Sequence, residues 1–205
     1  MQLPVAGHAS TMTDQPSVTA KHPAIDALFL NAGIQRRYDF TSPNLDLPQF
    51  DREVTTNFTS FVHLTASFLP FLISRQTPTG ILFTGTHISL VPAFPLPAYS
   101  ASKAALDAFI VCMREQLSST NVKVTHISAP PVQTEIHDSE MGAERGRKFG
   151  MPVEQFTAEV YGELVQGVEN IVVGTVGGSE KRHVLEIMTA REGAVQRLND
   201  LLKNF

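Results

Sequence analysis

Tyr99 and Lys103 stand four residues apart in the stretch PAYSASKAAL, residues 97–106. On a helix this spacing places both side chains on one face, so that the ammonium lies within reach of the phenol. A tyrosine must lose about three units from its ordinary pKa of ~10 to exchange protons near neutral pH, and a cation within about 4 to 6 Å favours that shift. The pair therefore suits a general acid and base, although an ordinary polar helix start has the same spacing.

Other polar residues follow apolar runs in the same part of the chain. Thr86 ends the run GILFTGT, thirteen residues before Tyr99, and Asn57 interrupts the helical stretch VTTNFTS. Asn-Ala-Gly at 31–33 and APPVQT at 129–134 each follow a further apolar run. Because ligands gather at the carboxyl ends of the strands in open α/β sheets, we expect these residues to surround one cleft.

The elements that must position these residues alternate along the chain. Long helical segments separate short continuous apolar runs, which is the pattern of βαβ units and a parallel sheet. One helix is predicted from about 49 to 74, with Pro70 kinking or ending it, and the stretch PAYSASK opens another. Strands are predicted within 25–33, 80–86, 121–130 and 170–174, the first of them buried on both faces.

The composition is that of one soluble domain: 205 residues, 42% hydrophobic, 18% charged, with a formal net charge of -4. A mild acidic excess without a basic run predicts neither a nucleic acid nor a membrane partner. The absence of a secretory signal or a long apolar run predicts a cytoplasmic location. The single cysteine, Cys112, excludes an internal disulfide and is expected to be buried; the histidines lack ligand spacing, so no metal site is predicted.

Taken in order, these motifs resemble the short-chain dehydrogenase/reductase family over about residues 24–134. The resemblance rests on NAG, Asn57 in the next helix, Thr86, YSASK and the Pro-x-Val-x-Thr loop. It implies one Rossmann-like domain over 1–205, a parallel sheet with flanking helices. It also implies an NAD(P)-dependent oxidoreductase that interconverts a carbonyl and an alcohol of a small-molecule substrate by hydride transfer, as a homodimer or homotetramer. The resemblance alone favours NADP over NAD.

The resemblance also implies roles for particular residues. Tyr99 would be the general acid/base, and Lys103 would hold the nicotinamide ribose and lower the pKa of Tyr99. Thr86 stands where the family has a catalytic serine, and Asn57 would anchor a water that relays protons through Lys103. The residues expected to line the cofactor cleft are Asn31, Ala32, Gly33, Pro131, Val132 and Thr134, together with the tyrosine and the lysine. His87 is interpreted as structural, on a strand face turned away from the cleft.

The family's usual glycine-rich turn, which receives the cofactor pyrophosphate at a helix N-terminus, has no counterpart here. Asn-Ala-Gly begins at residue 31, whereas family members usually place it after three strands. We therefore expect an N-terminally truncated sheet of about four strands of the usual seven, with the IDALFL strand as an apolar edge. The long polar segment 131–152 is predicted to be a lid over substrate and cofactor. Two alternatives stay open: a non-catalytic remnant that acts as a binding or partner subunit, and a non-redox isomerase or dehydratase using the same pair.

Overall fold

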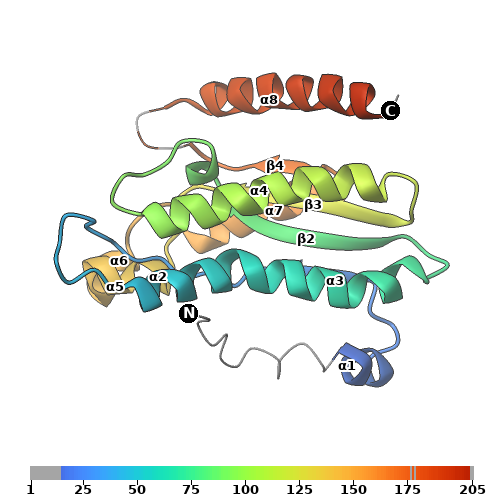
Figure 1. Cartoon of the computed structure of the whole chain (residues 1–205), viewed down its shortest axis with the longest axis horizontal. Helices are drawn as coiled ribbons and strands as arrows, with labels where there is room; N and C mark the ends of the chain where they lie inside the picture. Colours follow the sequence, from blue (N-terminus) through green and yellow to red (C-terminus); the bar gives the residue numbers. More distant parts are fainter. Residues whose placement is uncertain (1–14, 176, 178, 204–205) are drawn as a thin grey trace, which may run out of the picture.

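A computed structural model describes residues 15–175, 177 and 179–203 of the chain. Four strands form one parallel sheet in the order β1-β2-β3-β4 (Figure 1). They are β1 (Ala27–Leu30), β2 (Thr79–Thr86), β3 (Val122–Ala129) and β4 (Asn170–Val172). In register, Phe83 of β2 lies between Leu30 of β1 and His126 of β3. The predicted Rossmann-like α/β class, with four strands, is confirmed.

Helices connect the strands and cover the sheet, as parallel pairing requires. α1 (Gln15–Lys21) precedes β1, and the first crossover holds α2 (Leu47–Val54), the π-helical turn η1 (Thr55–Thr59) and α3 (Ser60–Ile73). The 3₁₀ turn η2 (His87–Ser89) and α4 (Pro97–Leu117) follow β2. After β3 come η3 (Glu135–His137), α5 (Asp138–Met141), α6 (Ala143–Gly146) and α7 (Val153–Val165), and after β4 comes α8 (Lys181–Leu202).

The helix predicted from 49 to 74 is present, but it begins earlier and is not regular. The Asp46 carboxylate accepts a hydrogen bond from the Gln49 amide at 2.9 Å, which caps α2 at Leu47. Pro70 does not stop α3 at once: the helix runs on to Ile73, where the Ser74 amide donates to the Pro70 carbonyl at 3.1 Å. The irregularity lies instead at η1, which carries Asn57.

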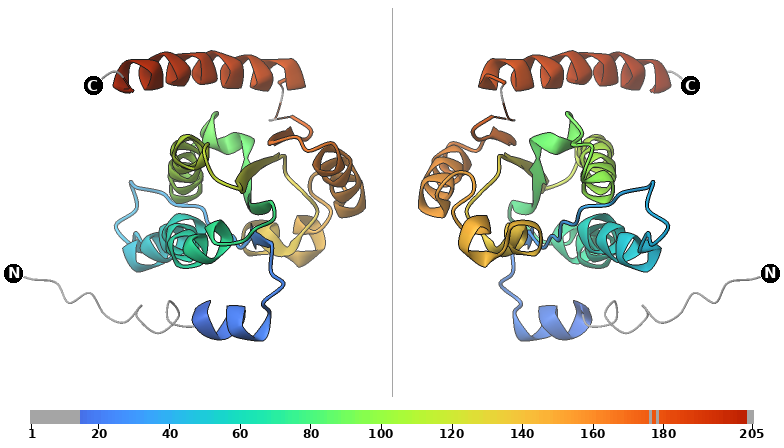
Figure 2. Two further views of the ribbon diagram at one scale, coloured as in Figure 1. Left: turned by 90° about the vertical axis from the view of Figure 1, so that its right-hand side faces the viewer. Right: turned by 90° about the vertical axis from the view of Figure 1, so that its left-hand side faces the viewer.

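Two apolar clusters hold the helices to opposite faces of the sheet. α3 and α4 pack on one face and α7 on the other, over β3 and β4 (Figure 2). The first cluster includes Phe61, Leu72, Ile81, Phe83, Leu106 and Ile110, each at most 1% exposed. The second centres on Ile127, Val160, Ile171 and Val173. The beginning of α4, which bears Tyr99 and Lys103, is thereby fixed against the sheet.

Two predictions of burial were wrong. β1 is half-buried rather than buried on both faces: Leu30 is 4% exposed and Phe29 is 57% exposed. The reason is that α7 packs over β3 and β4, while β1 lies at the opposite edge of the sheet. Cys112 is exposed, because the face of α4 that carries it points away from the sheet.

α8 runs outside α4 and β4 and is joined to them by polar contacts (Figures 1 and 2). Arg191 pairs with Asp107 of α4, and the Asn170 amide donates to Glu192 at 2.7 Å. A cavity of about 350 Å³ lies between α8, α4, β3 and β4. Within the described ranges, none of the helices, α8 included, has the length and hydropathy to cross a bilayer.

Candidate active site

The predicted pair lies in the first two turns of α4, where Pro97 starts the helix. Tyr99 is 8% exposed and Lys103 is 3% exposed. The Lys103 ammonium donates to the Thr84 carbonyl of β2 at 2.9 Å and lies 5.9 Å from the centre of the Tyr99 ring. The two side chains are therefore neighbours, and a main-chain carbonyl holds the cation in place.

Burial dominates the electrostatics of this pair. It lowers the pKa of Lys103 to about 8. Burial, followed by the charge of Glu53, raises the pKa of Tyr99 above its ordinary value. Desolvation of the phenolate dominates in this structure, and the expected lowering of the pKa of Tyr99 by Lys103 stays a prediction. The Tyr99 hydroxyl has no hydrogen-bond partner among the described residues, which leaves it free for another molecule.

Asn57 is fully buried in η1 and ties three segments together. Its Oδ1 accepts from the Ile34 amide at 2.9 Å, and its Nδ2 donates to the Ile34 carbonyl at 2.9 Å and to Ser102 Oγ at 3.2 Å. The loop after β1 is thus held beside α4. A β-carbon on Gly33 would lie 3.6 Å from Asn57 Oδ1 and 3.9 Å from Lys103 Nζ, so these three predicted residues meet at one place.

Asn31 and Ala32 lie exposed at the carboxyl end of β1. The Thr84 hydroxyl donates to Asn31 Oδ1 at 2.7 Å, which joins this turn to β2. The Asn-Ala-Gly turn therefore borders the same edge as Lys103, whose ammonium binds the carbonyl of Thr84.

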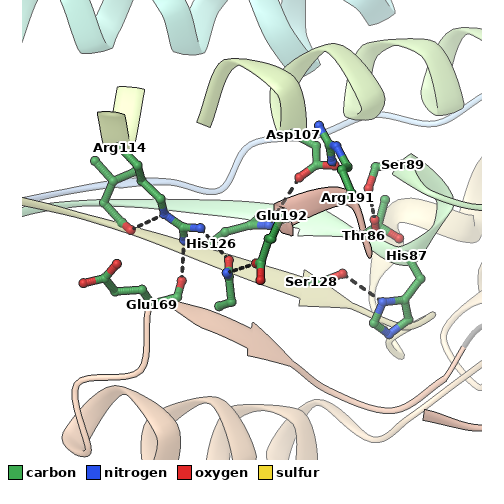
Figure 3. Close-up of polar contacts among 12 residues, drawn as sticks. Thr86, His87, Ser89, Asp107, Arg114, His126, Ser128, Glu169, Arg191 and Glu192 are labelled. Atoms are coloured by element: carbon green, nitrogen blue, oxygen red, sulfur yellow. Dashed lines mark hydrogen bonds and ion pairs between the residues drawn. The ribbon is translucent and has the colours of Figure 1, made fainter. Parts of the chain in front are cut away.

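Thr86 ends β2 and is 6% exposed. Its hydroxyl accepts from the Ile88 amide at 3.4 Å and caps η2, which packs against α4. His87 bridges the sheet, with Nδ1 2.8 Å from Ser128 Oγ and Nε2 2.8 Å from the Val173 carbonyl (Figure 3). Its structural interpretation is confirmed, although it begins η2 instead of continuing the strand.

Residues 131–152 form three short helical turns rather than an irregular loop. The segment closes on itself, since Pro131 and Gln133 exchange main-chain hydrogen bonds with Met151, each at 2.9 Å. It docks on the loop after β1: Gln35 Nε2 donates to Glu140 at 2.9 Å and Arg36 to Ser139 at 2.8 Å. Among the described residues, no hydrogen bond joins Pro131, Val132 or Thr134 to the tyrosine or the lysine. Their place over a cofactor stays a prediction.

Glu53 and Tyr38 also lie near this site, and no sequence motif singled them out. Glu53 is 0% exposed on α2, and the Tyr38 hydroxyl donates to its Oε2 at 3.1 Å. Glu53 stands four residues before Asn57, so the helical spacing that singled out Tyr99 and Lys103 could have found it.

A second polar cluster, also missed, lines the cavity beside α8 (Figure 3). His126 Nδ1 lies 3.6 Å from Asp107, which also pairs with Arg191. Arg114 donates to the Val124 and Glu169 carbonyls at 3.0 and 2.7 Å and to Asn170 at 2.6 Å. Protein acceptors bind each cation of this cluster, so we interpret it as structural and place the candidate site at Tyr99.

The residues at the edge fit the nicotinamide end of a dinucleotide. Lys103 donates one N–H to the Thr84 carbonyl. Its other two N–H groups have no partner among the described residues, and they lie near Gly33 and the phenol of Tyr99. The described part of the chain contains no glycine-rich turn between a strand and a helix that would receive the pyrophosphate.

Comparison with known proteins identifies the class. The family profile described as short chain dehydrogenase matches residues 5–144, and the chain belongs to this family. It is 30% identical over 158 residues to a Bacillus subtilis protein named uncharacterized oxidoreductase DltE, covering 77% of this chain and 62% of that protein. The curated relatives that it matches are longer, and the chain spans between 20% and 62% of their length.

Solved structures share the fold at low sequence identity. A short chain dehydrogenase from Burkholderia cenocepacia in complex with NADP superposes with a TM-score of 0.69 at 20% identity, covering 98% of this chain and 80% of that one. A 4-hydroxyisoleucine dehydrogenase complexed with NADH gives 0.66 at 17% identity, covering 87% and 79%.

Proposed function

We propose that this chain carries the site of an NAD(P)-dependent oxidoreductase that interconverts a carbonyl and an alcohol. The observation that supports it most is the buried Lys103 ammonium against the Tyr99 ring, next to Gly33 and Asn57 at the carboxyl edge of the sheet. Family membership supplies the chemical class, and the geometry supplies residues for it.

The nicotinamide cofactor, when bound, donates or accepts the hydride. Lys103 would hold the ribose hydroxyls with the donors that Thr84 leaves free, and Asn31, Ala32 and Gly33 would line the cofactor cleft beside it. Tyr99 gives its proton to the substrate oxygen in reduction and takes it back in oxidation. Thr86 hydrogen-bonds the substrate oxygen in place of a serine. Asn57 keeps the loop after β1 against Lys103 and is the residue we expect to hold a relay water.

The remaining parts of the proposal rest on likeness and composition. Proteins of the same fold are described with NADP in one case and NADH in another, and only the family resemblance favours NADP for this chain. Pro131, Val132, Thr134 and the segment 131–152 would cover the nicotinamide and the small-molecule substrate. A cytoplasmic location, expected from the sequence, and a homodimer or homotetramer, implied by the family resemblance, stay predictions.

Cofactor binding tests the proposal directly. The purified chain is titrated with NADPH and NADH while the cofactor fluorescence is recorded, and saturable binding below about 1 mM is expected. No binding of either cofactor at that concentration would overturn redox chemistry for this chain and favour the non-catalytic binding subunit or the non-redox enzyme.

Two variants separate the roles of the pair. Tyr99→Phe should reduce turnover by about 10²- to 10⁴-fold and leave cofactor affinity unchanged, because it removes only the proton donor. Lys103→Ala should lower both the turnover and the affinity for the cofactor. Tyr161→Phe is the matched control, since Tyr161 is 68% exposed on α7 and lies outside the site. Equal loss of cofactor binding in the Tyr99 and Lys103 variants would contradict these assignments.

A further inference from the structure

A buried carboxyl group lies beside this site with half of its hydrogen-bonding capacity unused. Glu53 is 0% exposed; its Oε2 accepts from the Tyr38 hydroxyl at 3.1 Å, while Oε1 has no partner among the described residues. A carboxylate taken out of water without a full set of donors is unfavourable, so such groups are neutral or have a role.

The position of Glu53 connects it with the tyrosine. α2 packs against α4, and Glu53 precedes Asn57 by one helical turn. The ionisable groups around it are Tyr38 and Arg36 from the loop after β1, Glu140 from α5 and Tyr99 from α4, with Lys103 one turn beyond Tyr99. The cation Arg36 of that loop lowers the pKa of Glu53, and the negative charge of Glu140 raises it.

These surroundings place the ionisation of Glu53 in the physiological range. Burial, assisted by Glu140, raises the pKa of Glu53 to about 7, although Tyr38 and Arg36 act in the opposite direction. The charge of Glu53 in turn raises the pKa of Tyr99 and that of Tyr38. The carboxyl therefore changes charge close to neutral pH beside a phenol that responds to that charge.

We propose that Glu53 is a third ionisable group of the Tyr99–Lys103 site, a positioning residue whose negative charge favours the protonated form of the Tyr99 phenol. Ionised Glu53 keeps the phenol protonated, which suits a proton donor to a carbonyl. A neutral side chain at position 53 would remove that constraint at any pH and make the phenolate, the base needed for alcohol oxidation, easier to form. Its catalytic consequence rests on the proposed function, whereas the coupling between the two side chains does not.

The chain allows this coupling to be observed without turnover. It has three tyrosines and no tryptophan, so ¹³C labelling of the tyrosine ζ-carbons gives three signals, assigned with Tyr99→Phe and Tyr38→Phe. From pH 5 to 9, well below phenol ionisation, the Tyr99 signal should show an inflection near pH 7 as Glu53 ionises. The signal of Tyr161, 68% exposed on α7, should show none and is the internal reference.

Glu53→Gln should abolish the Tyr99 inflection, and Tyr38→Phe should retain it, because the effect does not pass through Tyr38. Glu140→Gln is the matched carboxyl control: it should move the midpoint to lower pH and leave the inflection in place. An unchanged inflection in Glu53→Gln, or none in the unmutated chain, would overturn the proposal. If Glu53→Gln does not fold, the ¹³C-labelled carboxyl signal of Glu53 in the unmutated chain decides, since its midpoint must coincide with that of Tyr99.

Kinetics separate this proposal from the proposed function. If the chain turns over, Glu53→Gln should raise the rate of alcohol oxidation at a fixed pH by roughly tenfold for each unit by which the pKa of Tyr99 falls, with carbonyl reduction little changed. If the chain shows the inflection but binds no cofactor, the coupling between Glu53 and Tyr99 stands and the proposed redox function does not. Equal changes in both reaction directions would contradict control through the Tyr99 proton.

Discussion

The side-chain amide of Asn57 uses both of its polar atoms on the main chain of one residue, Ile34. This pairing substitutes for the backbone partners that a loop next to a sheet edge lacks. Asn57 is therefore a structural residue of the cleft, whatever solvent it also holds.

Asn57→Ala should lower the free energy of unfolding by about 2 kcal/mol, because it leaves the half-buried amide and carbonyl of Ile34 without partners. Urea denaturation measures this loss. Asn44→Ala, at an exposed loop position, should be nearly neutral. Equal stability of the Asn57 variant and the unmutated chain would mean that the loop after β1 does not depend on this amide.

Gly85 of β2 lies under the ring of His126, which belongs to the neighbouring strand β3 and pairs in register with Phe83. A β-carbon on Gly85 would lie 2.0 Å from His126 Nε2, closer than any contact allows, and His126 is 3% exposed. Gly85→Ala should therefore destabilise the protein by about 2 to 3 kcal/mol.

A second substitution, His126→Ala, should recover part of that loss, which a double-mutant cycle measures by urea denaturation. Gly80→Ala in the same strand is the control, since its β-carbon would meet its nearest atom, the Lys123 carbonyl oxygen, at an ordinary 3.6 Å. Additive effects of the Gly85 and His126 changes would show that the clash is not what destabilises the variant.

At the scale of elements, the sequence predicted what local patterns determine. β2 and β3 were found because their apolar runs are continuous, and α4 because the stretch PAYSASK opens a run with apolar residues at helical spacing. The half-exposed state of β1 depends on which helices cover it, and its own sequence, ALFL, is apolar throughout. The π-helical turn η1 has no sequence pattern that could predict it. Asn57 in this turn makes hydrogen bonds to distant parts of the chain, which local sequence does not reveal.

The candidate site likewise has one part that the sequence predicts and another that it does not. The spacing of Tyr99 and Lys103 was sufficient to predict that they are neighbours, because one helix carries both. Glu53 was missed because Asp-Arg-Glu is typical of a solvated helix face, and distant residues of the loop after β1 and α4 bury it. The raised pKa of Tyr99 follows from the burial of Tyr99 itself and from the charge of Glu53, and neither could be inferred from spacing.

β1 forms an edge of the sheet, and Phe29 makes that edge apolar. Phe29→Thr should reduce light scattering of concentrated solutions and change the free energy of unfolding by only about 0.5 kcal/mol, because the side chain is half-exposed and threonine favours strands. Phe94→Ser, at a phenylalanine that is 96% exposed outside the sheet, is the control. A similar reduction in both variants would indicate that exposed apolar area in general, and not the edge, drives association.

For the whole molecule, two buried groups act on stability in opposite senses over a shared pH range. Burial lowers the pKa of His126 to about 4, so its contribution to stability is lost as the pH falls from 6.5 through 4. Burial raises the pKa of Glu53 from 4.5 to about 7, so its contribution is present at low pH and is lost as the pH rises through 7. The two effects therefore oppose each other between pH 4.5 and 6.5.

Glu53→Gln should remove one of the two opposing effects. The difference in unfolding free energy between this variant and the unmutated chain should grow in favour of the variant from pH 4.5 to 7, by roughly 3 kcal/mol at most. Urea denaturation at several pH values measures it, and the histidines cancel because both chains contain them. A difference that does not vary with pH would show that Glu53 has an ordinary carboxyl pKa.

The wide turn at Thr55–Thr59 holds one residue more than an α-helical turn would need. Because the wider turn absorbs that residue, α2 and α3 keep the faces that an uninterrupted helix would give them. The first crossover can therefore carry a buried polar residue, Asn57, without turning the apolar side chains of α3 away from the core. A homologue that lost the surplus residue would keep both helices in place and would have to reach the loop after β1 from an ordinary α-helical turn.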